Sequence, residues 1–170
     1  GQRWLDNPDE ARSLIQSILA GASRRIIVVD PYFAGREMVE FLLTRVPQDV
    51  EITILTGAIY LKEKISCQTR QEQADGLAEK GNELNDLISQ AVDQNFNISA
   101  MVMTGDAAIH DRFLVVDEQV WFSGNSLNNI GQRASMLTRL HDPQSIISKI
   151  EEVMAGQRVV TLDDFLANRQ

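Results

Sequence analysis

The sequence contains few of the residues that build the common metal and redox sites. It has one cysteine, Cys67, and two histidines, His110 and His141. A single cysteine excludes an intrachain disulfide and any site built on clustered cysteines, and it favours a reducing, cytoplasmic location. Neither histidine has a second one at metal-ligand spacing, so we expect no metal and no other cofactor, and we expect Cys67 to be inert.

Long apolar runs and a surplus of positive charge are missing as well. No apolar stretch approaches the roughly 20 residues that a membrane-spanning helix needs, and the first residues lack the order of a signal peptide. We therefore expect no membrane partner. The formal net charge is −8, the wrong sign for a protein that binds nucleic acid mainly through a broad basic surface. A local basic pocket is still compatible with this charge.

Several widespread catalytic motifs are also absent. The sequence contains no G-x-x-x-x-G-K-[ST] loop, no G-x-S-x-G elbow, no H-E-x-x-H helix and no G-x-G-x-x-G after a strand. The common nucleotide, hydrolase and metalloprotease sites are thereby excluded.

The length of 170 residues fits one compact domain, 1–170, with a sizeable core. The chain begins with Gly1 and not with Met, and we expect it to be part of a longer protein with further domains.

What the sequence does contain is an alternation of strands and helices. Residues 8–21 have the spacing of an amphipathic helix capped by Asn7, and the β-branched run 26–29 is typical of a strand buried on both faces. Further helices are predicted over 35–46, 62–94 with a break around Gly81, and 142–156; further strands are predicted over 49–57, 97–105, 110–116, 120–122 and 134–140. This order predicts a layered α/β domain.

The segment 109–129 contains polar residues of the types that catalytic sites use. In an extended strand, side chains two residues apart share a face, so His110 and Arg112 would project together. Asp117 is expected to lie in a hairpin turn, after which the chain returns to a loop beside His110 that holds three polar residues: Asn125, Ser126 and Asn128. A nucleophile or base, a fixed positive charge and neutral donors around one point predict a phosphate site.

These residues resemble the phospholipase D-like phosphodiesterases, which carry the pattern H-x-K-x4-D-x6-G-S with a nearby Asn. The sequence has His110, Arg112 in place of the Lys, Asp117 and Gly124 at the same spacing, while Asn125 replaces the Ser, which is displaced by one. The run 26–33 is similar to the first sheet strand of such domains. The resemblance implies a layered sandwich with a mixed central β-sheet flanked by helices on both faces.

The resemblance also implies a metal-independent mechanism through a phosphohistidine. His110, Arg112 and Asp117 would be the catalytic residues: the histidine as nucleophile or general acid, the arginine on the phosphate oxygens, and the aspartate shaping the hairpin. The implied phosphate-binding residues are Asn125, Ser126 and Asn128. Such a site requires two motifs, and His141 is followed by Pro143 where the basic residue should stand. We therefore expect either a homodimer with paired His110 residues or a second motif in the parent protein.

Two functions are open at this point. The first is a phosphodiesterase that acts on nucleic acid or another phosphodiester, most simply a nuclease, and family analogy adds a role in bacterial defence. The second is a catalytically degenerate domain that serves as a dimerisation or protein-interaction module, which the acidic charge and Arg112 favour.

Isolated residues outside the motif have structural explanations. The stretch 30–32 follows a buried strand, where ligands often approach α/β sheets, but a turn with a packed Tyr explains it equally well. Trp121 and Phe122 are expected in the core or at a dimer contact. Lys62 and Lys64 could flank a phosphate, although a surface loop is the simpler interpretation.

Overall fold

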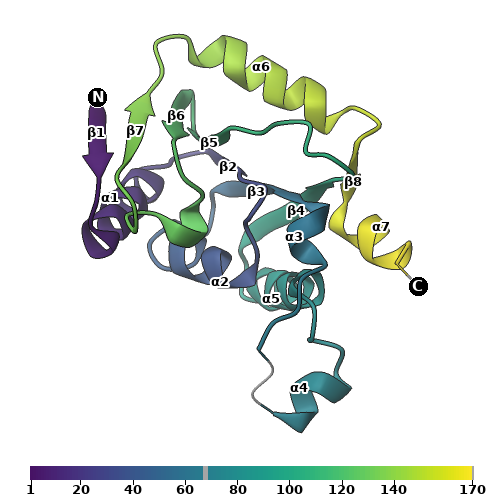
Figure 1. Cartoon of the computed structure of the whole chain (residues 1–170). Helices are drawn as coiled ribbons and strands as arrows, with labels where there is room; N and C mark the ends of the chain where they lie inside the picture. Colours follow the sequence, from purple (N-terminus) through teal and green to yellow (C-terminus); the bar gives the residue numbers. More distant parts are fainter. Residues whose placement is uncertain (67–68, 170) are drawn as a thin grey trace.

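The computed structural model describes residues 1–66 and 69–169, and within them one mixed β-sheet forms the centre (Figure 1). Its strands are β1 (Gln2–Leu5), β2 (Arg25–Val29), β3 (Glu51–Gly57), β4 (Asn97–Met103), β5 (Arg112–Val116), β6 (Gln119–Ser123), β7 (Ser135–Arg139) and β8 (Val159–Thr161). They lie in the order β1-β7-β6-β5-β2-β3-β4-β8. β2, β3 and β4 are parallel, and the other neighbours are antiparallel.

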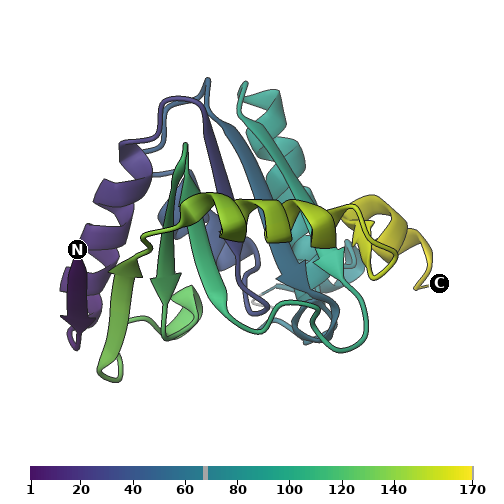
Figure 2. The ribbon, with the colours of Figure 1, turned by 90° about the horizontal axis from the view of Figure 1, so that it is seen from above.

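Helices cover both faces of this sheet. They are α1 (Pro8–Ala20), α2 (Gly35–Glu37), the π-helical η1 (Met38–Leu42), α3 (Ala58–Leu61), α4 (Arg70–Ala74), α5 (Lys80–Asp93), the 3-10 helix η2 (Leu127–Asn129), α6 (Pro143–Met154) and α7 (Leu162–Ala167). α6 runs across one face, as Figure 2 shows from above, while α1, α2 and α5 lie against the other (Figure 1). The predicted α/β architecture is therefore confirmed.

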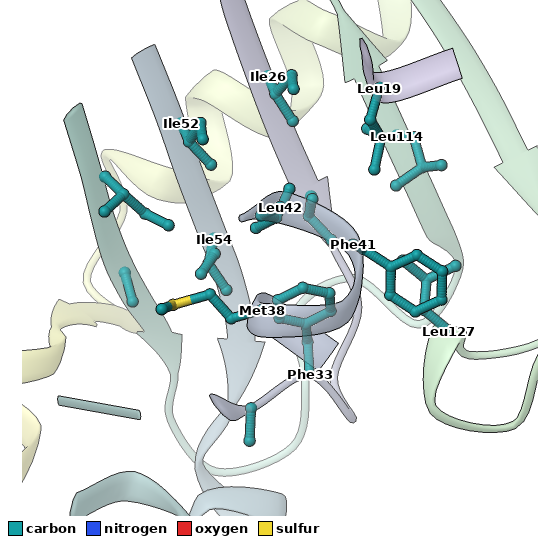
Figure 3. Packing of buried hydrophobic residues seen from close by; sticks show 14 of the residues in the cluster. Leu19, Ile26, Phe33, Met38, Phe41, Leu42, Ile52, Ile54, Leu114 and Leu127 are labelled. Carbon is teal, nitrogen blue, oxygen red and sulfur yellow. The ribbon is translucent and has the colours of Figure 1, made fainter. Parts of the chain in front are cut away.

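The central strand β2 is buried on both faces, as its β-branched run predicts. Ile26 and Val28 point into the core beneath α1, η1 and α5, while Ile27 and Val29 point into the smaller core beneath α6. Figure 3 shows the larger core, where Phe33, Met38 and Phe41 pack over the sheet. Alternation along one strand thus joins two cores through the sheet, which is why parallel strands of this kind read as continuous apolar runs.

Local signals placed several elements correctly. Asn7 caps α1 because its side chain accepts a hydrogen bond from the backbone N–H of Glu10. Asp142 caps α6 in the same way, with a hydrogen bond from the backbone N–H of Ser145. Both helices begin with proline, whose missing N–H is not needed at the first position of a helix. The hairpin of β5 and β6 is also confirmed, with Asp117 in the turn at φ 54°.

The long helix predicted over 62–94 is wrong in its first half. Among the described residues of this range, 62–66 and 69–94, the helices are the short α4 and the long α5. Gly81 lies inside α5 and does not break it; a side chain at this position would come within 3.3 Å of the Leu61 carbonyl oxygen. The glycine therefore marks a close approach between α5 and α3. Cys67 lies outside the described residues.

The sequence prediction also missed both edges of the sheet and misjudged one helix. The strands β1 and β8 were not predicted, because they are short and gain stability only from their neighbours. The helix α7 was not predicted either. The helix expected over 35–46 ends at Leu42, after a π-helical turn.

Candidate functional site

Polar side chains gather at the end of the sheet where β2 and β3 finish and β5 begins. β2 runs antiparallel to β5, with Val29 opposite Phe113, so Asp30 and Arg112 lie at the same end. β6 ends there too, since Ser123 pairs with Arg112, and the loop 124–129 follows. The hairpin therefore brings this loop to the start of β5, as predicted. The carboxyl ends of parallel strands are the usual ligand position in open α/β sheets.

Asp30 is the centre of this region and is 1% exposed. The Ser126 hydroxyl donates to its carboxylate at 2.8 Å from both oxygens, and the backbone N–H of Leu127 donates to Oδ2 at 2.8 Å. The backbone N–H of Tyr32 donates to Oδ1 at 2.9 Å. One buried carboxylate thus fastens the loop 124–129 to the end of β2, and Leu127 itself is buried in the core (Figure 3).

Burial raises the pKa of Asp30, and this effect outweighs the hydrogen bonds from Leu127, Tyr32 and Ser126, which lower it. The positive charge of Arg112 also lowers the pKa of Asp30. The Arg112 guanidinium lies 5.8 Å from the centre of the Tyr32 ring. Its buried Nε has no hydrogen-bond partner among the described residues. We call Asp30, Arg112 and Ser126 the Asp30 corner.

His110 lies two residues before β5 and is exposed. The strand begins at Arg112, so the two side chains do not share a strand face as the alternation predicted. Within the part of the chain that the structure describes, the His110 side chain forms neither a hydrogen bond nor an ion pair. It is therefore free to contact a ligand or a second molecule, and its catalytic role stays a prediction.

The three predicted phosphate-binding residues occupy different surroundings. Ser126 directs its only hydroxyl hydrogen at Asp30, so in this arrangement it positions the loop and offers no free donor. The backbone carbonyl of Asn125 accepts a hydrogen bond from the Ser123 hydroxyl at 2.7 Å, and the Asn125 side chain is half-buried. Asn128 lies farther along the loop, next to Tyr60.

Tyr60 and Glu37 form a second network, near Asn128, that the sequence prediction missed. The Tyr60 hydroxyl donates to Glu37 Oε1 at 3.0 Å, while the buried Asn128 Oδ1 has no hydrogen-bond partner among the described residues. Glu37 is 2% exposed, and burial raises the pKa of its carboxyl group. Tyr60 follows β3 at the same end of the sheet at which Asp30 follows β2. This shared edge is a signal that would have found Tyr60, whereas nothing in the helical spacing of Glu37 marks it as buried.

A cleft of about 1150 Å³ opens beside the Asp30 corner. Tyr32, Tyr60, Glu37 and Asn128 line it, whereas His110 and Arg112 do not. The rings of Tyr32 and Tyr60 meet edge to face at 5.8 Å. Its remaining lining is Ala34, Gly35, Arg36, Val39, Glu40, Glu63, Lys64, Ile65, Ser66, Lys80, Glu83 and Leu87. Lys64 therefore does border the site region, but it pairs with Glu79 at 3.7 Å.

Asp117 lies at the opposite end of β5 from Arg112, so the structure does not bring it together with His110 and Arg112 as a catalytic group. Its carboxylate accepts hydrogen bonds from the backbone N–H groups of Ser23, Arg24 and Arg25. These donors fasten the hairpin turn to the start of β2, which is the shaping role expected of Asp117.

Residues 1–66 and 69–169 contain no cluster of three His, Cys, Asp or Glu side chains arranged to hold a metal ion. The same residues contain no helix that is long and apolar enough to cross a membrane.

Comparison with known proteins identifies the fold. No protein-family model and no curated protein sequence matches the chain. Among solved structures, it is similar to phosphatidylserine synthase from Haemophilus influenzae, with a TM-score of 0.66, 16% identity, and coverage of 100% of this chain and 41% of the synthase. It is also similar to Nuc, a phospholipase D family member from Salmonella typhimurium, with a TM-score of 0.61, 12% identity, and coverage of 95% of this chain and 97% of Nuc.

NucT from Helicobacter pylori is a third similar structure, with a TM-score of 0.54, 11% identity, and coverage of 89% of this chain and 92% of NucT. The chain thus spans less than half of the synthase but almost all of Nuc and NucT. Because these structures match 89–100% of the chain, this protein has a phospholipase D-like fold.

Proposed function

We propose that this domain is a metal-independent phosphodiesterase whose substrate is nucleic acid or another phosphodiester. The observation that carries the proposal is the exposed His110, two residues before Arg112, at the end of the sheet where ligands approach α/β folds. The fold, which is similar to that of Nuc, a phospholipase D family member, supports it. Attachment to further domains, as in bacterial defence systems, extends the proposal by analogy alone.

In the proposed reaction, the His110 imidazole attacks phosphorus and forms a P–N bond while the bond to the leaving oxygen breaks. A second histidine donates its proton to that oxygen. Water then attacks phosphorus, the second histidine accepts its proton, and the P–N bond breaks to release a phosphate monoester. Arg112 would bind the non-bridging oxygens and stabilise the charge that develops on them.

The second histidine would come from another copy of the chain. His141 follows β7 at the opposite end of the sheet, next to the start of β6, so it cannot serve the same site. A two-fold axis would bring the partner's His110 against His110, and the exposure of this side chain leaves it available for such pairing. The proposed enzyme is therefore a homodimer with a shared site.

The test is a turnover assay in EDTA with bis(p-nitrophenyl) phosphate, single-stranded DNA and RNA. We expect His110→Ala to lower turnover about a thousandfold and Arg112→Ala about a hundredfold. His141→Ala is the matched control, because it removes the other histidine, also exposed, and should leave turnover unchanged. Turnover that persists in His110→Ala, or that EDTA abolishes in the wild type, contradicts the proposal.

A specific observation favours a second candidate, a degenerate domain that mediates dimerisation or protein binding. The negative charge of Asp30 faces Arg112, and Ser126 already donates to Asp30. Arg112 and Ser126 thus already have Asp30 as an interaction partner when no ligand is bound. A wild-type protein that sediments as a dimer but turns over none of the three substrates would support this second function.

A further inference from the structure

The cleft beside the Asp30 corner is lined by an arginine with few interactions of its own. The Arg36 side chain is 76% exposed and lines this cleft. Its guanidinium donates to the backbone carbonyl of Asn128 at 3.4 Å and lies 3.9 Å from Glu37 Oε2. Both contacts are longer than a normal N–H···O hydrogen bond, and a guanidinium has five N–H donors. Arg36 can therefore still bind an anion in the cleft.

The two lysines of the cleft are already paired. Lys64 lies 3.7 Å from Glu79, and Lys80 lies 2.7 Å from Glu63. Lys80 also lies over the ring of Tyr60, at 4.1 Å from its centre. These pairs neutralise the lysine charges locally. Arg36 is thus the cation of the described cleft that is best placed to bind a phosphate, and its planar guanidinium suits that ligand.

The carboxylates of the cleft also have partners, with one exception. Glu37 is buried and accepts a hydrogen bond from Tyr60. Glu40 forms an ion pair with Arg12. Glu83 forms no ion pair in the described part of the chain, and burial raises the pKa of its carboxyl group. Glu83 is therefore the remaining charge that would repel an anion bound to Arg36.

The short helix α2 presents Arg36 to the cleft. Gly35 precedes it, and a Cβ atom at this position would lie 2.5 Å from Leu87 Cδ1 and 3.0 Å from Glu83 Oε1. The glycine thus allows α2 to approach α5 closely. The next residue along, Glu37, is 2% exposed. Burial of its neighbours on this helix therefore leaves Arg36 as the side chain that extends into solvent.

Tyr32 connects the cleft with the proposed phosphate site. Its ring centre lies 5.8 Å from the Arg112 guanidinium, and its side chain also lines the cleft. The residue is 41% exposed, so part of the ring is open to a ligand. Single-stranded nucleic acid binds to such surfaces, because its phosphates contact cations while its unpaired bases stack on aromatic rings.

We propose that the cleft is a subsite for single-stranded nucleic acid. The scissile phosphate lies at Arg112, an adjacent base stacks on Tyr32, and a neighbouring phosphate binds Arg36. This inference rests on the proposed function for the place of the scissile phosphate, and it names the substrate class of that function. A base in a duplex is already stacked and paired, so duplex nucleic acid would have to be opened before it could occupy the cleft.

Binding of a short fluorescent oligothymidylate, measured by anisotropy in EDTA, tests the role of Arg36. We expect Arg36→Gln to raise Kd about fivefold. The slope of log Kd against log salt concentration should fall by about 0.7, the contribution of one phosphate contact to single-strand binding. Arg139→Gln is the matched control, because Arg139 is also exposed but lies at the opposite end of the sheet. It should change neither quantity.

Two further variants separate a direct contact from a structural effect. Glu83→Gln removes the opposing charge of the same cleft and should lower Kd about twofold. Damage to the cleft would weaken binding in both variants, whereas an anion at Arg36 shifts Kd in opposite directions. Tyr32→Leu should raise Kd about tenfold, the effect of one lost stacking contact. Thermal melting of each variant confirms that it is folded.

Substrates of different size and form complete the test. Arg36→Gln should raise KM for the oligonucleotide at least fivefold more than KM for bis(p-nitrophenyl) phosphate, because the small diester has only one phosphate. The wild type should also bind the single strand at least about tenfold more tightly than a duplex of the same length, because opening the duplex costs free energy.

The outcomes distinguish this inference from the proposed function. If the wild type turns over the small diester but Arg36→Gln binds the oligonucleotide no more weakly than Arg139→Gln, the subsite is refuted and the proposed function stands. Equal binding of single strand and duplex refutes it in the same way. If binding depends on Arg36 as expected but no substrate is turned over, the proposed function fails and the nucleic acid subsite is supported.

Discussion

Two aspartates fasten the two ends of the same strand pair, and they behave in opposite ways. Asp30 follows β2 and Asp117 follows β5, which runs antiparallel to β2, so they lie at opposite ends. Asp30 accepts hydrogen bonds from the backbone N–H groups of the nearby Tyr32 and the distant Leu127. Asp117 accepts from those of the distant segment 23–25. Asp30 is buried and its pKa is raised, whereas Asp117 is partly exposed and its pKa is lowered.

The difference between them is solvation. For Asp30, desolvation raises the pKa by more than all its hydrogen-bond donors lower it. For Asp117, desolvation is also the largest single effect and raises the pKa, but the N–H groups of residues 23–25 and the charge of Arg24 together outweigh it. Similar numbers of donors therefore accompany a raised pKa at the buried carboxyl group and a lowered pKa at the partly exposed one. Groups with perturbed pKa values are typical of functional sites, which agrees with the position of Asp30 beside Arg112.

The largest expected difference between the two ends is in stability. Asp30→Ala leaves the Ser126 hydroxyl and the N–H groups of Leu127 and Tyr32 without an acceptor in a buried place, so we expect a loss of about 3 kcal/mol of unfolding free energy. Asp117→Ala frees its donors to water and should cost about 1 kcal/mol, as for a capping residue. Urea unfolding measures both. Equal losses would show that burial does not distinguish the two ends; if Asp30→Ala does not fold, Asp30→Asn takes its place.

A smaller effect is expected for the hydroxyl that Asp30 holds. Ser126→Ala removes one donor to the carboxylate and should cost about 1.5 kcal/mol. Ser135→Ala should change stability by less than about 0.5 kcal/mol, because it removes a buried hydroxyl without a partner in the described residues. Denaturant midpoints of the two variants give the comparison, and a Ser135 variant as unstable as the Ser126 variant would mean that cavity formation, and not the bond to Asp30, sets the loss.

The two ends should respond to pH with opposite sign. The folded-state pKa of Asp117 is lowered, so its contribution to stability is present above the unfolded pKa of about 3.9 and is lost as the pH falls through the folded value. The folded-state pKa of Asp30 is raised, so its contribution is present below about 3.9 and is lost as the pH rises through the folded value. The stability difference between wild type and Asp117→Asn should therefore grow from about pH 3 to 6, and that for Asp30→Asn should shrink. Urea unfolding across this range would contradict us if both differences changed in the same direction.

The smallest effect concerns the surface charges around Asp117. Glu118 is half-exposed and pairs with Arg24 and, at 3.6 Å, with Arg25. Such pairs are weak, so Glu118→Gln should lower the unfolding free energy by less than about 0.5 kcal/mol, and about 0.5 M salt should remove the difference. The loss in Asp30→Ala should be insensitive to the same salt, since its missing contacts are buried hydrogen bonds. A salt-sensitive Asp30 effect would place that carboxylate in reach of solvent ions.

Much of the fold followed from local patterns. The caps at Asn7 and Asp142, the β-branched run of β2 and the hairpin turn at Asp117 all depend on residues within a few positions of one another. The predicted motif loop also lies where the hairpin requires it. The edge strands β1 and β8 escaped prediction because their stability comes from neighbours far away in the sequence.

The sequence by itself determined the strand and helix order and the spacing from His110 to Asn128, because both depend on short-range periodicity and turn chemistry. Only the tertiary structure decided which partners those residues have. It joined Ser126 to Asp30 across 96 positions, joined Tyr60 to Glu37, and placed Asp117 at the far end of the sheet. The physical reason is that strand pairing and burial, and not local sequence, decide which polar groups lose their water and must find one another.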